Sequence, residues 1–220
     1  MYALRVAAFS LIALVMAVAP LPVTAQGRFG DAELLKSLRA GGFVVVMRHA
    51  TADPDRADID PLNFRNIKAQ QPLTERGRQS AKALGETFNR LGITFGEVLT
   101  SRFNRAYQTA VLAGYKGAKP VTELTEGSLV VSPNENRRRA AFLKQLTATP
   151  PSPGQNRLIV THRANIAQAF GREWWDMKEG EASIFRVERG AYSLVARLQI
   201  DEWNRLLVIA SRESPQFGPQ

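Results

Sequence analysis

Phe43-Val44-Val45-Val46-Met47-Arg48-His49-Ala50 is the stretch that decides the fold of this chain. Five apolar residues, three of them valines, lead directly into an arginine and a histidine. The run is short and two glycines precede it, which is typical of a strand buried on both faces of a parallel sheet. Ligands of open α/β sheets bind at the carboxyl edge of the strands. Arg48 and His49 are therefore expected at a binding edge.

A second histidine stands in the same setting. The apolar run Leu158-Ile159-Val160 leads through Thr161 to His162, and the chain of 220 residues has no histidine besides these two. If both runs are parallel strands of one sheet, both imidazole rings reach the same edge. This coincidence favours a shared functional role over two unrelated structural histidines.

Helix-like and strand-like patterns alternate along the rest of the chain. Between 73 and 91, apolar residues recur at helical spacing after a threonine that can cap the helix, and a glycine follows. Further helices are expected over 31–38, 104–114, from Ser132 onward and over 165–170, the last capped by Asn165. Further strands are expected over 97–101, 119–123, 183–187, 192–200 and 203–209. This order predicts an α/β fold, a three-layer α/β/α sandwich with a mostly parallel central sheet.

The first 25 residues have the pattern of a secretory signal peptide. A short basic start is followed by an apolar run, then by prolines and the small residues that signal peptidase requires. The run is short for a membrane anchor. We expect cleavage after Ala25, a single domain over 26–220, and a periplasmic or secreted protein with no stable membrane association after cleavage.

Composition narrows the possible partners. The formal net charge is +9, and the chain has no cysteine, which excludes disulfides, thiolate metal sites and a cysteine nucleophile. The positive charge suits an anionic substrate. Nucleic acid is not expected, because the basic residues are scattered and no nucleic-acid motif accompanies them. The oligomeric state cannot be read from these features.

Four cationic or imidazole side chains are expected to converge at the sheet edge. Arg48 and His49 end the first strand, His162 ends a later one, and Arg105 opens the helix after the second strand. A guanidinium group matches the oxygens of a phosphate, and a helix N-terminus adds backbone donors. A histidine in such a site can attack phosphorus and carry the phosphoryl group.

Met47-Arg48-His49-Ala50 resembles the Arg-His-Gly signature, with its Arg-His-Ala variant, of the histidine phosphatase superfamily, the phosphoglycerate-mutase-like proteins. Three further stretches resemble that family in order and spacing: Leu73-Thr74-Glu75-Arg76-Gly77, the segment from Ser101 to Ala110, and Val160-Thr161-His162. The resemblance spans roughly residues 41–170. It implies the phosphoglycerate-mutase-like fold.

The resemblance also implies the chemistry. His49 would be the nucleophile that becomes phosphohistidine, and Arg48, Arg105 and His162 would bind the phosphoryl oxygens. No metal and no cofactor are expected. The chain is thus expected to be an exported, metal-independent phosphatase of small phosphomonoesters. Its physiological substrate cannot be read from the sequence.

The general acid is the open point of this assignment. The family's mutase-like branch uses a glutamate in a Leu-x-Glu context, and Leu124-Thr125-Glu126 is the nearest match, although the pattern that usually follows is missing. Glu123, Glu181 and the aspartates Asp53 and Asp55 of the polar stretch 51–72 are the alternatives. The other branch uses an aspartate directly after the second histidine, and Arg163 occupies that position here.

Three other functions remain open at this point. A degenerate family member would bind phosphorylated ligands without turnover, as the uncertain acid allows. A phosphomutase is disfavoured by the expected export. A metal site on the two histidines is disfavoured because arginines, not carboxylates, adjoin both of them.

Overall fold

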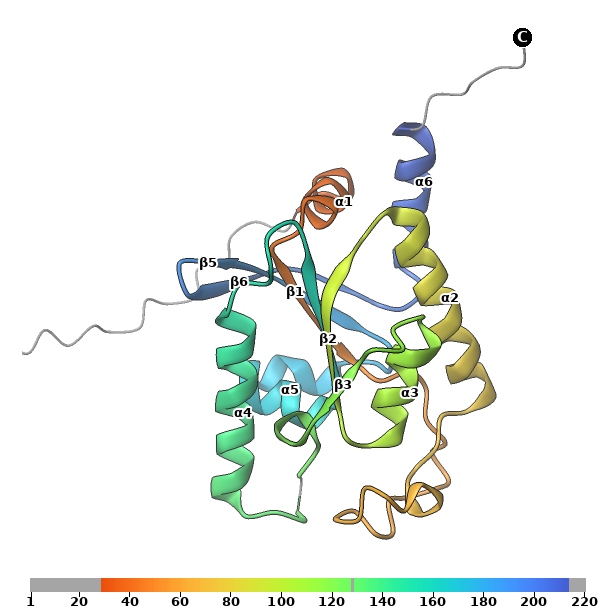
Figure 1. Cartoon of the computed structure of the whole chain (residues 1–220), viewed down its shortest axis with the longest axis vertical. Helices are drawn as coiled ribbons and strands as arrows, with labels where there is room; N and C mark the ends of the chain where they lie inside the picture. Colours follow the sequence, from red (N-terminus) through yellow and green to blue (C-terminus); the bar gives the residue numbers. More distant parts are fainter. Residues whose placement is uncertain (1–28, 128, 214–220) are drawn as a thin grey trace, which may run out of the picture.

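The structure is a computed structural model that describes residues 29–127 and 129–213 (Figure 1). Along the chain the elements are α1 (Asp31–Ala40), β1 (Phe43–Arg48), α2 (Glu75–Leu91), β2 (Phe95–Ser101), α3 (Asn104–Leu112), β3 (Lys119–Val121), α4 (Pro133–Ala148), β4 (Asn156–Thr161), α5 (Arg163–Phe170), β5 (Ala182–Glu188), β6 (Ala191–Leu198) and α6 (Trp203–Glu213). Short 3₁₀ helices lie at Ile67–Ala69, Thr122–Leu124 and Arg172–Asp176.

The strands form one sheet in the order β3-β2-β4-β1-β5-β6. The first four strands of the chain are parallel, whereas β5 and β6 run antiparallel to their neighbours. In the register of β1 and β4, Arg48 lies beside Thr161. His49 and His162 are the residues that directly follow these two strands. The sheet therefore brings the two histidines together at its carboxyl edge, as predicted.

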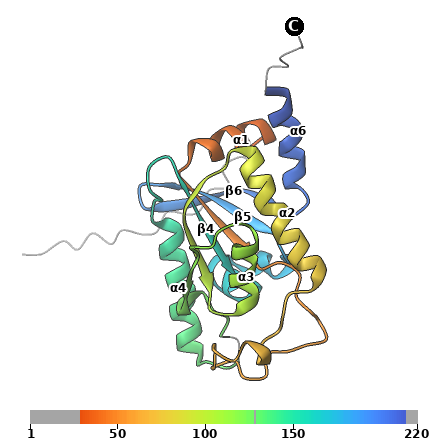
Figure 2. The same cartoon turned by 45° about the vertical axis from the view of Figure 1, so that its right-hand side comes forward.

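Helices cover both faces of the sheet, which confirms the three-layer sandwich. Side chains of β1 alternate between the two layers: Val45 and Met47 pack with α1, α2, α3 and α6, and Val44 and Val46 pack with α4 and α5. Figures 1 and 2 show these two groups of helices on opposite sides of the strands. Both faces of β1 are buried, which explains why its sequence is continuously apolar.

The expected strand over 203–209 is wrong, because this segment forms helix α6. Trp203 and Leu206 are fully buried one helical turn apart, while Asn204 and Arg205 are exposed. The Trp203 ring meets the Phe88 ring edge to face at 4.8 Å between centroids. Helical spacing of the buried residues therefore outweighs the strand preference of the β-branched residues in this segment.

The helix after β4 also begins earlier than expected. α5 starts at Arg163, with His162 in the N-cap position, so Asn165 lies inside the helix and does not cap it. The helix expected from Ser132 onward is confirmed as α4, and the Ser132 hydroxyl caps it by accepting a hydrogen bond from the Glu135 amide at 3.2 Å.

Residues 51–72 form a long loop that hangs below the carboxyl edge of the sheet (Figure 1). Its two ends are joined by an antiparallel bridge between Ala52 and Leu73. Residues 1–25, the expected signal peptide, lie outside the described residues. Within residues 29–127 and 129–213, no helix has both the length and the apolar character to cross a membrane.

Candidate active site

His49 follows β1 directly, and its ring is oriented by the main chain. Nδ1 lies 2.8 Å from the carbonyl oxygen of Ala50. A carbonyl oxygen only accepts hydrogen bonds, so Nδ1 carries the proton and donates it. In the neutral ring the lone pair then lies on Nε2, which is the nucleophilic position.

Both histidines are held in the neutral form. Burial, reinforced by the charge of Arg105, lowers the pKa of His49 to about 3. The same two causes, burial first, lower the pKa of His162 well below its ordinary value. A histidine that stays unprotonated in weak acid keeps its lone pair available for attack on phosphorus.

His162 lies beside His49, with 5.2 Å between the ring centroids. Its Nε2 is 2.7 Å from the hydroxyl oxygen of Ser101, which also accepts a hydrogen bond from the Phe103 amide at 3.0 Å. The hydroxyl proton of Ser101 can therefore point to Nε2, which places the ring proton of His162 on Nδ1. Nδ1 is buried and has no hydrogen-bond partner in the structure, so it is available to donate to a ligand.

Arg105 is the most buried cation of the site, at 3% exposure. Its Nη1 donates to both carboxylate oxygens of Asp58, at 3.0 and 2.9 Å, and its guanidinium lies over the Phe103 ring at 4.5 Å. On the other edge, Nη2 has only a 3.5 Å contact with Glu126, and the buried Nε has no partner. A buried donor without a partner is costly. This edge of Arg105 therefore fits two oxygens of an anion.

Arg48, the residue before His49, is held by the segment that leads into β5. Its Nη1 donates to the carbonyl oxygen of Met177 at 2.8 Å, and Nη2 pairs with Glu179 at 3.1 Å. Burial lowers the pKa of the Arg48 guanidinium below its ordinary value, and the carboxylate of Glu179 opposes that shift. An arginine still remains charged. The exposed Arg163 lies near enough to Arg48 to lower the same pKa, and its guanidinium lies 5.9 Å from the Trp175 ring.

Glu126 is the candidate acid that the structure places at this site. Its Oε2 lies 3.7 Å from Nδ1 of His162 and 3.5 Å from Nη2 of Arg105. Its position is fixed through the preceding residue. The carbonyl oxygen of Thr125 accepts hydrogen bonds from the buried Arg139 at 2.8 Å and from Asn165 at 3.2 Å.

The other candidate acids are engaged elsewhere. The Glu181 carboxylate is buried, pairs with Arg197 at 2.6 Å and accepts a hydrogen bond from the amide of Lys178 at 2.9 Å. Asp53 accepts a hydrogen bond from the amide of Asp55 within a turn of the long loop. Neither arrangement brings a carboxylate to the two histidines.

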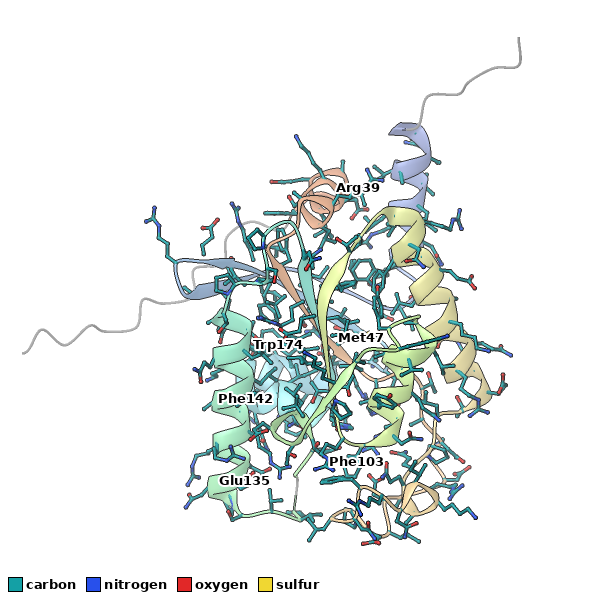
Figure 3. The ribbon with its side chains drawn as sticks, viewed as in Figure 1. Arg39, Met47, Phe103, Glu135, Phe142 and Trp174 are labelled. Atoms are coloured by element: carbon teal, nitrogen blue, oxygen red, sulfur yellow. The ribbon has the colours of Figure 1, made fainter. Side chains whose placement is uncertain are left out.

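A cavity of about 410 Å³ opens next to Arg105 and Glu126. It lies between the long loop, which contributes Asp58 and Pro61, and the segment after Glu126, which contributes Val130. Phe103, labelled in Figure 3, lies between α3 and the long loop and forms part of the cavity wall. The cavity can receive the part of a ligand that extends away from the histidines.

Two motif residues outside the cavity hold the segment after His49 in place. On α3, the Thr109 hydroxyl accepts a hydrogen bond from the Ala50 amide at 3.0 Å and donates to the carbonyl of Arg105 at 2.7 Å. At the start of α2, the Thr74 amide donates to the carbonyl of Thr51 at 3.0 Å. The spacing of the motifs therefore reflects contacts that position His49 and Arg105 relative to each other.

Gly77 allows α2 to approach this segment closely. A Cβ atom at this position would lie 2.0 Å from the carbonyl oxygen of Thr51. We expect Gly77→Ala to lower the free energy of unfolding by about 2 to 3 kcal/mol, because backbone must shift. Urea unfolding measures this. Gly117→Ala is the control, since a Cβ there meets nothing within 4 Å; equal effects of the two changes would contradict the packing argument.

The lowered pKa of His49 predicts a loss of stability in acid. Between the folded pKa of about 3 and the unfolded value of about 6.5, the unfolded state binds more protons, so stability rises with pH in this window and falls on acidification. When the pH falls from 7 to 4, we expect the free energy of unfolding of His49→Asn to decrease by about 2 to 3 kcal/mol less than that of the natural protein. Urea unfolding at several pH values measures the difference, and parallel pH profiles of the two proteins would exclude it.

Several groups of the site were not singled out from the sequence. Asp58 belongs to the acidic stretch 51–72, but nothing in the sequence distinguishes it from its neighbours as the partner of Arg105. Glu179 does not belong to any of the motifs. Arg139 follows two other arginines and no motif distinguishes it from them, yet it is buried. Ser101 does open the motif that contains Arg105, and its contact with His162 gives that serine a physical role.

Comparisons with known proteins give a family match over part of the chain. A family model described as the histidine phosphatase superfamily (branch 1) matches residues 44–127. The match includes Arg48, His49, Arg105 and Glu126, and it ends before His162. An uncharacterised protein from Picosynechococcus sp. is 27% identical over 169 residues, which cover 74% of this chain and 93% of that protein.

Solved structures share the fold at low sequence identity. YhfR from Bacillus stearothermophilus has a TM-score of 0.53 at 18% identity and covers 70% of this chain and 95% of its own. Rv3214 from Mycobacterium tuberculosis has a TM-score of 0.51 at 18% identity and covers 70% and 96%. A mutant phosphoserine phosphatase from Entamoeba histolytica, in complex with phosphoserine, has a TM-score of 0.50 at 12% identity and covers 73% and 98%. These similarities confirm the expected fold class.

Proposed function

Because the family model of the histidine phosphatase superfamily matches residues 44–127, we propose that this chain hydrolyses phosphomonoesters through a phosphohistidine formed on Nε2 of His49. One observation carries the proposal: the hydrogen bond from Nδ1 to Ala50 leaves Nε2 unprotonated beside an arginine whose Nε and Nη2 edge fits an anion. A nucleophile and an oxyanion site are thereby adjacent.

In the first step the Nε2 lone pair of His49 attacks phosphorus and forms a P–N bond. The P–O bond to the leaving group breaks, and its electron pair passes to the leaving oxygen. Glu126, in its protonated form, gives its proton to that oxygen, so the product leaves as a neutral alcohol. The phosphoryl group then stays on His49.

In the second step water attacks the phosphohistidine. The Glu126 carboxylate takes a proton from the water as its oxygen bonds to phosphorus. The P–N bond breaks, its electron pair returns to Nε2, and inorganic phosphate leaves. Both the histidine and the glutamic acid are then in their starting forms, so the cycle balances.

Three groups stabilise the charge that develops on the phosphoryl oxygens. Arg105 offers Nε and Nη2, His162 offers the proton on Nδ1, and Arg48 supplies a positive charge held by Met177 and Glu179. Donors fixed before the reaction need no reorganisation during it. The positive charge comes from the chain itself, so we propose that turnover needs no metal.

The test is hydrolysis of p-nitrophenyl phosphate between about pH 4 and 8 with EDTA present. We expect metal-independent release of phosphate, together with a mass increase of one phosphoryl group on the peptide containing His49 after rapid quenching. Binding of inorganic phosphate without turnover of any monoester would instead indicate a degenerate, ligand-binding member of the family. Loss of all activity in EDTA, restored by a divalent cation, would contradict the mechanism.

Glu126→Gln should separate acid catalysis from the rest of the mechanism. The change retains size and polarity but removes the transferable proton, so we expect kcat on an alkyl phosphate to fall by about 10² to 10³-fold. The loss should be much smaller on p-nitrophenyl phosphate, whose leaving group needs little protonation. Glu181→Gln is the matched control. Equal losses on both substrates would show that Glu126 is not the acid.

We also propose that the protein is exported, which rests on the signal-peptide pattern of residues 1–25 alone. Sequencing the N-terminus of the protein recovered from the periplasm or the medium tests this. A mature start at Gln26 is expected, and retention of the whole chain in the cytoplasm would contradict it.

A further inference from the structure

The cavity beside Arg105 is where the leaving group of a substrate must lie. This follows from the proposed function, because the phosphoryl group occupies the space between the histidines and Arg105, and Glu126 marks the leaving side. The cavity walls include the apolar side chains of Pro61, Phe103 and Val130. The polarity of the cavity walls therefore indicates what kind of alcohol the enzyme releases.

Besides Arg105 and Glu126, which the reaction uses, two charged groups line this cavity, and both already bind other groups of the protein. Asp58 pairs with Arg105 and also accepts a hydrogen bond from the Gln71 amide at 2.9 Å. Arg56 donates to the carbonyl of Lys68 at 3.1 Å. A sugar or another polyol needs several convergent donors and acceptors for its hydroxyl groups. Apart from Glu126, which the reaction uses, the cavity offers few such groups.

Exposed apolar side chains concentrate on the two segments that line the cavity, and one of them, Val130, is part of the cavity wall. Seven large apolar side chains are exposed in the described part of the chain, and five of them lie on the two segments that line the cavity. These five, which we call the apolar rim, are Ile59 (80% exposed), Leu62 (67%), Ile67 (55%), Leu129 (99%) and Val130 (46%). Figures 1 and 2 both place the long loop beside the segment that leads into α4.

A second hollow extends this surface beyond the rim. It has a volume of about 500 Å³ and is lined in part by Leu129, Val131, Pro133 and Ala140. The short segment after Glu126 thus separates two cavities, with Val130 facing one and Leu129 facing the other. Single exposed apolar residues are ordinary, but their concentration around a ligand cavity marks a binding surface.

We propose that the substrate is a phosphate monoester of an apolar alcohol. Its phosphate lies between His49, His162 and Arg105, and its hydrocarbon part passes Phe103 and spreads over the apolar rim. Continuity between the phosphate site and the rim is the argument for this occupant, since a chain that starts at the leaving oxygen has to leave the protein through this cavity. The proposal rests on the phosphatase function.

The test compares kcat/KM for ethyl, butyl, hexyl and octyl phosphate, all below their micellar concentrations. Full burial of a methylene group is worth about a fourfold gain in binding. The rim is partly open, so we expect about a twofold gain in kcat/KM per methylene. Glycerol phosphate, a polar substrate of similar size to butyl phosphate, should be hydrolysed less well than butyl phosphate.

The double variant Leu62→Ser, Leu129→Ser should abolish the gain with chain length. Neither residue touches the reacting groups, so its activity on ethyl phosphate should remain near that of the natural protein. Val208→Ser is the matched control, because Val208 is also an exposed apolar residue, at 52%, but lies on α6. This variant should keep the full gain.

The outcomes separate this inference from the function on which it rests. If p-nitrophenyl phosphate is hydrolysed but kcat/KM does not change from ethyl to octyl phosphate, the proposed substrate class is overturned and the phosphatase function stands. No hydrolysis of any monoester would overturn both. A dimer that the double variant dissociates, combined with no chain-length effect, would assign the rim to a second copy of this chain and overturn the inference.

Hydrolysis of phosphatidic acid in vesicles would identify a membrane lipid as the source of the alcohol. Hydrolysis of monomeric octyl phosphate alone would identify a soluble alcohol. Either result supports the proposal.

Discussion

Replacing His49 with alanine is expected to reduce kcat on p-nitrophenyl phosphate by at least about 10⁴-fold while the protein stays folded. The substitution removes the only group placed to form the P–N bond. No neighbour can take over this role, since the lone pair of His162 on Nε2 faces the Ser101 hydroxyl. The covalent route is therefore lost, and only slow direct attack by water remains.

Phosphate binding distinguishes this loss from damage to the site. Arg48, Arg105 and His162 are unchanged in the variant, so calorimetry should still detect binding of inorganic phosphate within about tenfold of the natural affinity. Removing a buried, neutral histidine should not unfold the protein, which a thermal melt at neutral pH verifies. Retention of a tenth or more of the natural kcat would show that His49 is not the nucleophile.

Replacing Arg105 with alanine should have the second largest effect, a loss of about 10³-fold or more in kcat/KM, divided between a higher KM and a lower kcat. In the proposed mechanism, Arg105 contributes the Nε and Nη2 donors to the phosphoryl oxygens in both the bound substrate and the transition state. The variant also leaves Asp58 without the guanidinium that pairs with it. Two carboxylates, those of Asp58 and Glu126, then border the phosphate site and repel the anion.

Arg105→Lys should recover little of this loss. A lysine provides one ammonium group in place of the planar guanidinium that binds Asp58 on one edge and two phosphoryl oxygens on the other. Arg102→Ala is the control, because Arg102 lies on the same segment but is exposed, with its guanidinium 4.8 Å from the Phe64 ring. If Arg102→Ala lowered kcat/KM as much as Arg105→Ala, general electrostatic attraction would explain the effect better than direct contact.

The layered fold was predictable because its two central strands, β1 and β4, are buried on both faces. The apolar runs ending at Arg48 and at Thr161 have no polar alternation, and only a central position in a parallel sheet accounts for that. Once both strands are parallel neighbours, the meeting of His49 and His162 follows from topology. The strand predicted for 203–209 is wrong because the consecutive Leu, Leu, Val and Ile of this segment also suit a strand. Only the burial of Trp203 and Leu206 reveals the helical period.

The partners of the catalytic groups were less predictable than the groups themselves. Asp58 reaches Arg105 through a loop whose course depends on irregular contacts, such as that between Asp58 and the Gln71 amide. Loops lack the periodicity from which strands and helices are inferred. Glu126 is hard to identify from the sequence because its surrounding motif is incomplete. Its position depends on Arg139 and Asn165, which bind the preceding carbonyl from two different helices.

The hydrogen bond from His49 to Ala50 has a consequence for how this site tolerates mutation. In enzymes that orient a histidine with an aspartate side chain, one codon change can remove the acceptor and spoil the tautomer. Here the acceptor is a peptide carbonyl, which every residue at position 50 provides. The orientation of the proposed nucleophile therefore survives any substitution at position 50 that leaves the backbone in place. Because this position is fully buried, only small residues fit there. Inactivating mutations in a random library should then gather at His49 and the groups that bind phosphate, and the tautomer of His49 should be among the most mutationally robust features of the protein.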